Sequence, residues 1–90
     1  MDLFLEALAD GGVACGLPRA AAMELAAQMV VGSARLQQES GKHPGALKDA
    51  VCSPGGTTIQ GVRTLEEHGF RAAVMDAVIA AYEKTAALKK

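Results

Sequence analysis

The longest helical pattern in the chain lies between Pro18 and Gly41, and it is apolar on two sides. Proline suits the first turn of a helix, so we expect this helix to run from Pro18 to about Glu39, where Ser40-Gly41 ends it. One apolar stripe contains Met23, Ala26, Ala27, Val30, Val31 and Ala34, and the other contains Leu25, Met29, Gly32 and Leu36. A helix with two apolar sides needs a neighbour on each of them.

A second long helix is predicted from Phe70 almost to the C-terminus, and it has the same property. One face carries Phe70, Val74, Ala77, Val78 and Ala81, and another carries Met75, Ile79 and Tyr82. A single copy of a short chain cannot cover both long helices twice. We therefore expect a homodimer in which the long helices of two copies interleave, with Tyr82 as an interface residue.

The remaining segments complete an all-α domain. Apolar spacing and turn residues predict helices over Asp2–Cys15, over Pro44–Val51, and from Thr57 or Thr58 to Gly69. No strand pattern or internal repeat is present. Half of the 90 residues are hydrophobic but only 3% are aromatic, so the interior must be built from small side chains on closely approaching helices. The sequence predicts one five-helix domain over residues 1–90.

Charge and cysteine usage exclude several classes of function. Nine Lys and Arg residues nearly balance ten Asp and Glu residues without a basic block, which argues against nucleic acid as a partner. No apolar run reaches the roughly 18 residues of a membrane span, and no signal peptide is evident, so we expect a cytoplasmic protein without membrane contact. Cys15 and Cys52 lack metal-ligand spacing and are predicted to be reduced, half-buried thiols, with no metal site.

One loop, Cys52–Thr58, has the residues of a small binding site. Gly55 and Gly56 permit unusual backbone angles and close approach of a ligand, while Thr57 and Thr58 place free amides at a helix start. Such a terminus favours a carboxylate or phosphate, and the hydroxyls of Ser53 and the threonines can complete the pocket.

Two readings of this loop stay open on the residues alone. The segment can also be an ordinary tight turn followed by a threonine helix cap. A P-loop is excluded because no lysine follows the glycines, and a dinucleotide fingerprint is excluded because no strand precedes them. His43 and His68 lie at a predicted helix start and helix end, where capping is the expected role rather than catalysis.

The loop and its flanks closely resemble the C-terminal domain of the pyrroline-5-carboxylate reductase family. The matching loop residues are Leu47–Asp49, Val51–Ile59, Gly61 and Leu65–Glu66. The likeness extends along the chain through Glu6–Val13, Gly16–Pro18, Ala26–Gln28, Gly41–Pro44 and Gly69–Ala73.

This resemblance implies an oxidoreductase that reduces 1-pyrroline-5-carboxylate to L-proline with NADPH or NADH in proline biosynthesis. It implies that backbone amides around Gly56, Thr57 and Thr58 hold the substrate carboxylate and that Ser53 and Gly55 shape the loop. The Thr58 hydroxyl would hydrogen-bond the ring nitrogen and is the catalytic candidate.

The same resemblance sets limits on what this chain does by itself. In the family an N-terminal Rossmann domain binds the dinucleotide, and we expect that domain to be absent here. The chain alone would then form a homodimer, and the sequence does not decide whether dimers assemble into higher oligomers. It would bind no cofactor and be inactive. The competing hypothesis is a non-catalytic helical dimerisation module whose glycine loop is only a turn.

Overall fold

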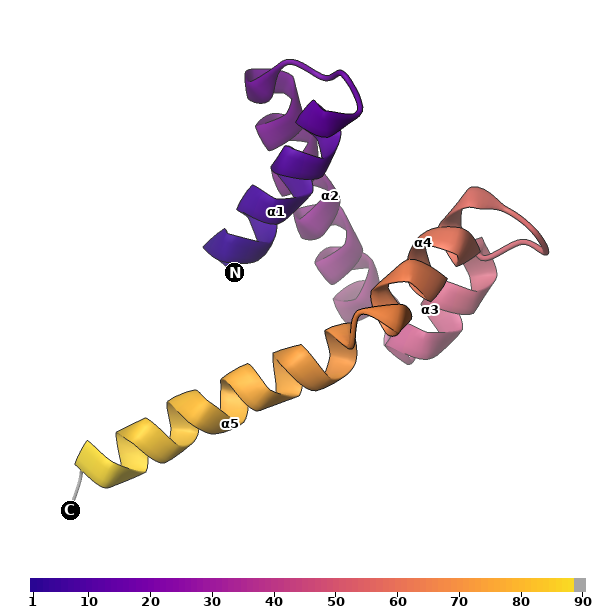
Figure 1. The fold of residues 1–90 in the computed structure, drawn as a ribbon. Helices are drawn as coiled ribbons and strands as arrows, with labels where there is room; N and C mark the ends of the chain where they lie inside the picture. Colours follow the sequence, from indigo (N-terminus) through magenta and orange to yellow (C-terminus); the bar gives the residue numbers. More distant parts are fainter. Residues whose placement is uncertain (89–90) are drawn as a thin grey trace. The chain divides into compact units, whose positions relative to one another are not determined.

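The computed structural model describes residues 1–88, and helices are their only regular elements (Figure 1). In chain order the helices are α1 (Asp2–Ala14), α2 (Arg19–Ser40), α3 (Pro44–Val51), α4 (Thr57–Glu67) and α5 (Phe70–Leu88). The predicted all-α class and its five helices are confirmed. The chain divides into two compact units at a boundary inside α3, between Leu47 and Lys48, and each unit is described by itself.

In the first unit α1 and α2 form a hairpin, which Figure 1 shows as two helices lying against each other. Gly16 adopts a φ of 106°, its amide donates to the Val13 carbonyl at 2.9 Å, and the Leu17 amide donates to the Gly12 carbonyl at 3.0 Å. This pair of bonds is a Schellman motif, which satisfies the last carbonyls of α1. Pro18 precedes α2 as its N-cap, one residue earlier than the predicted position in the first turn.

The buried contact between α1 and α2 consists of alanines. Ala9, Ala22 and Ala26 are the buried hydrophobic residues of the part of the chain described. Gly12 faces the same contact, where an added Cβ would lie 3.2 Å from the Cβ of Ala22. Ala26 belongs to the first predicted stripe, but Ala9 and Ala22 were not predicted, because small side chains give a weaker signal than Leu8 or Met23. The helices approach closely because nothing large separates them.

The large apolar residues of α2 are left exposed instead. Leu25, Met29 and Leu36, all from the second predicted stripe, keep between 52% and 57% of their surface exposed. Met23 and Val31 of the first stripe are also exposed. Within the first unit, packing against α1 therefore leaves the second predicted apolar stripe of α2 exposed.

The second unit contains α4 and α5, joined at Gly69. This glycine has a φ of 70°, and ion pairs flank it: Arg71 Nε donates to Glu66 Oε1 at 2.9 Å, and Arg63 Nε donates to Glu67 Oε1 at 3.1 Å. All four side chains are largely exposed, so each pair contributes at most about 1 kcal/mol. Only the Glu66–Arg71 pair crosses the junction from α4 to α5, since Arg63 and Glu67 both belong to α4, and neither pair supplies a core.

Helix α5 buries no residue within the part of the chain described. Val78 is 65% exposed and Tyr82 is 72% exposed, although both belong to the predicted apolar faces. A long helix with this composition is not stable in water on propensity alone, because most helical stability in proteins comes from tertiary packing. The helix requires a surface that covers it.

Two smaller features complete the description. Cys52 is half-buried as predicted, but Cys15, the C-cap of α1, is exposed; both are free thiols. Within residues 1–88 no helix combines the length and the apolarity that crossing a membrane requires.

The alanine contact makes a testable prediction at Gly12. We expect Gly12→Val to lower the free energy of unfolding by about 1 to 3 kcal/mol, because its side chain must push Ala22 away. The matched control is Gly11→Val, where an added Cβ has no neighbour within 4 Å. Urea denaturation followed by circular dichroism, at one protomer concentration, measures both. Equal effects of the two variants would contradict the close packing.

Candidate functional site

The loop between α3 and α4 is a tight turn built from Ser53, Pro54, Gly55 and Gly56. The Gly56 amide donates to the Ser53 carbonyl at 3.0 Å, and Gly55 has a φ of 69°. Proline at the second position and a left-handed glycine at the third are the requirements of a type II turn. Pro54 and Gly55 therefore specify the turn, which the sequence predicted at Ser53–Gly56.

Gly56 is the N-cap of α4, and no side chain caps this helix end. An added Cβ on Gly56 would lie 3.2 Å from the Ser53 carbonyl oxygen and closer still to Ser53 Oγ. The serine side chain thus lies directly against the glycine. The tight turn of the ordinary reading is confirmed, but its threonine cap is wrong, because Thr57 is already the first helical residue.

Three backbone amides at the start of α4 have no acceptor. Among residues 1–88 the Gly56 amide is used in the turn and the Gln60 amide donates to the Gly56 carbonyl at 3.4 Å. The amides of Thr57, Thr58 and Ile59 lie between these two and enter no backbone hydrogen bond, as the geometry of a helix start dictates. Two of these free amides, those of Thr57 and Thr58, belong to the predicted donor set, whereas the Gly56 amide of that set is engaged in the turn.

The surroundings of these amides suit an anion. The first turn of α4 carries no acidic residue, so no carboxylate of its own competes for the donors. The partial positive charge at the start of α4 also favours an anion. Thr57 and Thr58 are exposed, and Ser53 is exposed on the other side of the turn. The five predicted residues, Ser53 and Gly55 to Thr58, thus lie within the turn and the first two positions of α4.

The histidines have the structural role that was predicted for them. His43 Nδ1 accepts a hydrogen bond from the Gly45 amide at 2.9 Å, at the start of α3. His68 Nδ1 lies 2.9 Å from the Thr64 carbonyl oxygen, at the end of α4. Within residues 1–88 no group of three or more His, Cys, Asp and Glu side chains could hold a metal ion.

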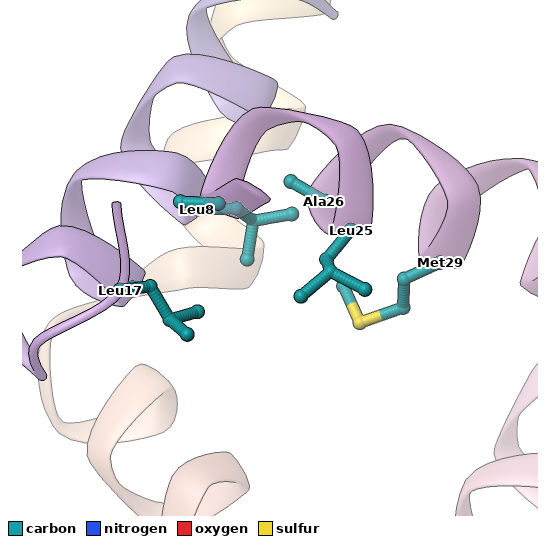
Figure 2. Close-up of a pocket in the computed structure, with 7 residues that line it drawn as sticks. Leu8, Leu17, Leu25, Ala26 and Met29 are labelled. Carbon is teal, nitrogen blue, oxygen red and sulfur yellow. The ribbon is translucent and has the colours of Figure 1, made fainter. Parts of the chain in front are cut away.

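A pocket elsewhere in the chain was not predicted. It has a volume of about 190 Å³ and lies on the α1–α2 hairpin, where Figure 2 shows Leu8, Leu17, Leu25 and Met29 projecting toward one open side. Its lining is entirely apolar and contains none of the loop residues. The sequence feature that could have indicated this pocket was the apolar stripe with Leu25 and Met29, which we had assigned to an interface.

Together the helices and the turn define a class: an all-helical domain with exposed apolar helix faces and with free backbone amides at the start of α4. Comparison with known proteins gives the family. Residues 1–88 match the family described as pyrroline-5-carboxylate reductase dimerisation, and the chain belongs to that family.

The related proteins are reductases of the same name. The chain is 59% identical over 88 residues to the pyrroline-5-carboxylate reductase of Escherichia coli K12, covering 98% of this chain and 33% of the relative. It is 57% identical over 88 residues to that of Arabidopsis thaliana, covering 98% of this chain and 32% of the relative. The chain thus spans about a third of the length of the curated relatives it matches.

Solved structures agree with this assignment. A Plasmodium falciparum pyrroline carboxylate reductase with NADP bound matches with a TM-score of 0.87 at 43% identity, over 91% of this chain and 31% of the other. The Streptococcus pyogenes 1-pyrroline-5-carboxylate reductase matches with a TM-score of 0.81 at 48% identity, over 83% of this chain and 29% of the other.

We predict opposite effects of alanine at Gly56, which is the N-cap of α4, and at Gly61, which lies inside α4. We expect Gly56→Ala to lower the free energy of unfolding by about 1 kcal/mol or more, because alanine is a poor N-cap and its Cβ displaces Ser53. Gly61→Ala, where the added Cβ meets nothing within 4 Å, should raise it by up to about 1 kcal/mol. Thermal unfolding of both variants at equal protomer concentration checks this, and stabilisation by both would show that the turn does not hold Ser53 against Gly56.

Proposed function

We propose that this chain is the substrate-binding and dimerisation domain of a pyrroline-5-carboxylate reductase, which reduces 1-pyrroline-5-carboxylate to L-proline. The observation that carries the proposal is the row of acceptor-free amides at Thr57, Thr58 and Ile59, in a chain that belongs to this family. The substrate is a small carboxylate, and these amides suit such a ligand without any cationic side chain.

Hydrogen bonds, more than the helix dipole, would hold the carboxylate. A hydrogen bond to a charged group contributes about 1.5 to 3 kcal/mol, whereas the dipole at an exposed helix end contributes about 0.3 to 1 kcal/mol. Two hydrogen bonds from backbone amides would therefore contribute more binding free energy than the helix dipole. Gly55 keeps the approach open because an added Cβ there would meet nothing within 4 Å, and Gly56 leaves room for the Ser53 side chain that lies against it.

Thr58 would orient the imino ring. With the carboxylate on the amides, the hydroxyl of Thr58, which lies in the first turn of α4, would hydrogen-bond the ring nitrogen. Holding both ends of a small ring presents one face of its C=N carbon to the reductant, and this positioning is the main contribution we assign to Thr58. Proton delivery to the nitrogen is a second role that the same hydroxyl could perform.

The reductant would be bound outside the described residues. The start of α4 follows a turn rather than a strand, and the apolar pocket on α1 and α2 offers no donor to a phosphate, so neither fits a dinucleotide. When bound, NADPH or NADH supplies the hydride. The role of this chain is to hold and orient the imino acid for that transfer.

A second copy of the chain is the proposed partner. The exposed apolar faces of α2 and α5 are larger than isolated surface residues explain, and the family is one of dimerisation domains. We propose an interleaved homodimer, which can assemble further into larger oligomers.

The test is a chimera in which residues 1–88 replace the matching segment of the E. coli reductase. Oxidation of NADPH driven by pyrroline-5-carboxylate is expected. In this chimera Thr58→Val should lower kcat/KM by about 2- to 13-fold if the hydroxyl only orients the ring, which corresponds to the loss of one neutral hydrogen bond. A loss of about 100-fold or more would assign proton delivery to it as well.

Two controls make the result specific. Thr58→Ser retains the hydroxyl and should keep kcat/KM within about threefold of the parent chimera, since one neutral hydrogen bond is preserved. All variants should remain dimeric by size-exclusion chromatography. A chimera that folds and dimerises but does not reduce the substrate would instead favour a non-catalytic dimerisation module.

A further inference from the structure

The backbone amides at the start of α3 are all satisfied by one residue, His43. Its Nδ1 accepts a hydrogen bond from the Gly45 amide at 2.9 Å, and its carbonyl oxygen accepts from the Ala46 and Leu47 amides at 2.9 and 3.2 Å. Pro44, the first residue of α3, has no amide hydrogen. The start of α3 is therefore closed by His43, whereas the start of α4 keeps three free amides.

The imidazole ring of His43 lies directly against Gly45. A Cβ added to Gly45 would lie 3.0 Å from Nδ1 and 3.3 Å from Cε1. Because the Gly45 amide is a donor, this Nδ1 must carry a lone pair, so the proton of the neutral ring is on Nε2. A protonated ring donates from both nitrogens and cannot make this bond, and its charge would lie at the positive end of the helix. Uncapped α3 therefore binds more protons than capped α3, and acid favours the uncapped form.

His68 has the opposite arrangement at the end of α4. Its Nδ1 lies 2.9 Å from the Thr64 carbonyl oxygen, which can only accept, so here Nδ1 carries the proton. The charged ring keeps this bond, and its charge lies at the C-cap of α4, where the helix dipole favours a cation. Protonation thus weakens the start of α3 and preserves the end of α4.

We propose that His43 is an acid-sensitive cap, whose protonation releases the start of α3 and loosens the turn at Ser53–Gly56. Helix α3 has only eight residues, and a helix of this length is marginal by itself. Between the end of α3 at Val51 and the turn lies Cys52, whose amide donates to the Asp49 carbonyl at 3.2 Å. Fraying of α3 that reaches Asp49 breaks this last hydrogen bond before the turn.

The charges around His43 do not oppose this response. The charged residues nearest in sequence are Glu39 and Lys42 on one side and Lys48 and Asp49 on the other. Lys48 Nζ lies 3.1 Å from Asp49 Oδ1, and among residues 1–88 no carboxylate forms an ion pair with His43. Neither of the closely packed helix pairs, α1–α2 and α4–α5, includes α3. A charged His43 ring therefore gains no partner that replaces the lost hydrogen bond.

Nitrogen-15 NMR of the imidazole rings tests the two protonation states directly. At about pH 8, where histidine is largely neutral, we expect the proton of His43 on Nε2 and that of His68 on Nδ1. Between about pH 8 and about pH 5 the ratio of helix to coil over Pro44–Val51 should fall by about 2- to 30-fold, the effect of losing one N-cap. Carbon-13 shifts of the Cα atoms measure this ratio. A proton on Nδ1 of His43 at the higher pH, or a helix ratio that does not change with pH, would overturn the proposal.

The matched variant is His43→Asn. Asparagine is among the best N-cap residues, and its Oδ1 accepts a hydrogen bond without titrating, so α3 should keep one helix ratio at both pH values. His68→Asn removes the other histidine and should retain the acid response of the parent chain. A response that persists in His43→Asn, or that disappears in His68→Asn, would contradict the assignment to His43.

The link to the turn rests on the proposed function and is tested in the E. coli chimera. KM for pyrroline-5-carboxylate is measured at about pH 6 and about pH 8, with and without His43→Asn, because the ratio of the two proteins cancels the titration of the substrate. With His43 present, KM should rise further in acid, by up to about 30-fold. An equal change in both proteins would disprove the link to the turn. An inactive chimera would affect only the reductase proposal, because the NMR measurements require no activity.

Discussion

The close approach of α1 and α2 through Ala9, Ala22, Ala26 and Gly12 is the contact on which the first compact unit depends. Small side chains permit a short distance between the helix axes, but they bury little apolar area and so contribute little free energy. The same choice pushes Leu25 and Met29 to the rim of the hairpin. A chain that uses alanine for its interior leaves its large apolar side chains for another surface, and the exposed faces of α2 and α5 are the result.

The candidate site does not need this core. Its turn is closed by one hydrogen bond from the Gly56 amide to the Ser53 carbonyl, and its shape follows from Pro54 and the positive φ of Gly55. The donors follow from the start of α4 itself. Local backbone chemistry therefore forms the part of the site that we propose for the substrate carboxylate, while the proposed assembly and hydride transfer involve surfaces beyond the turn.

The difference between local backbone chemistry and packing between helices explains what could be predicted from the sequence. The helices were recognised because Gly16, Gly41 and Gly69 mark where helices end, and all three have positive φ. The turn was recognised because proline and glycine restrict it directly. Ala9 and Ala22 were not, because burial of a small residue depends on which helix lies opposite it. The pocket was missed for the same reason, since it arises from the difference in size between Gly12 and its neighbours across two helices.

The central claim is that a second copy covers the apolar faces which one copy leaves exposed. Sedimentation equilibrium of the 90-residue chain, whose mass is 9.2 kDa, tests it most directly. We expect a mass twice that value at micromolar concentration, which falls toward the single-chain value together with helix content on dilution, because α5 depends on its partner for packing. A species of 9.2 kDa that keeps its full helix content at micromolar concentration would contradict the claim.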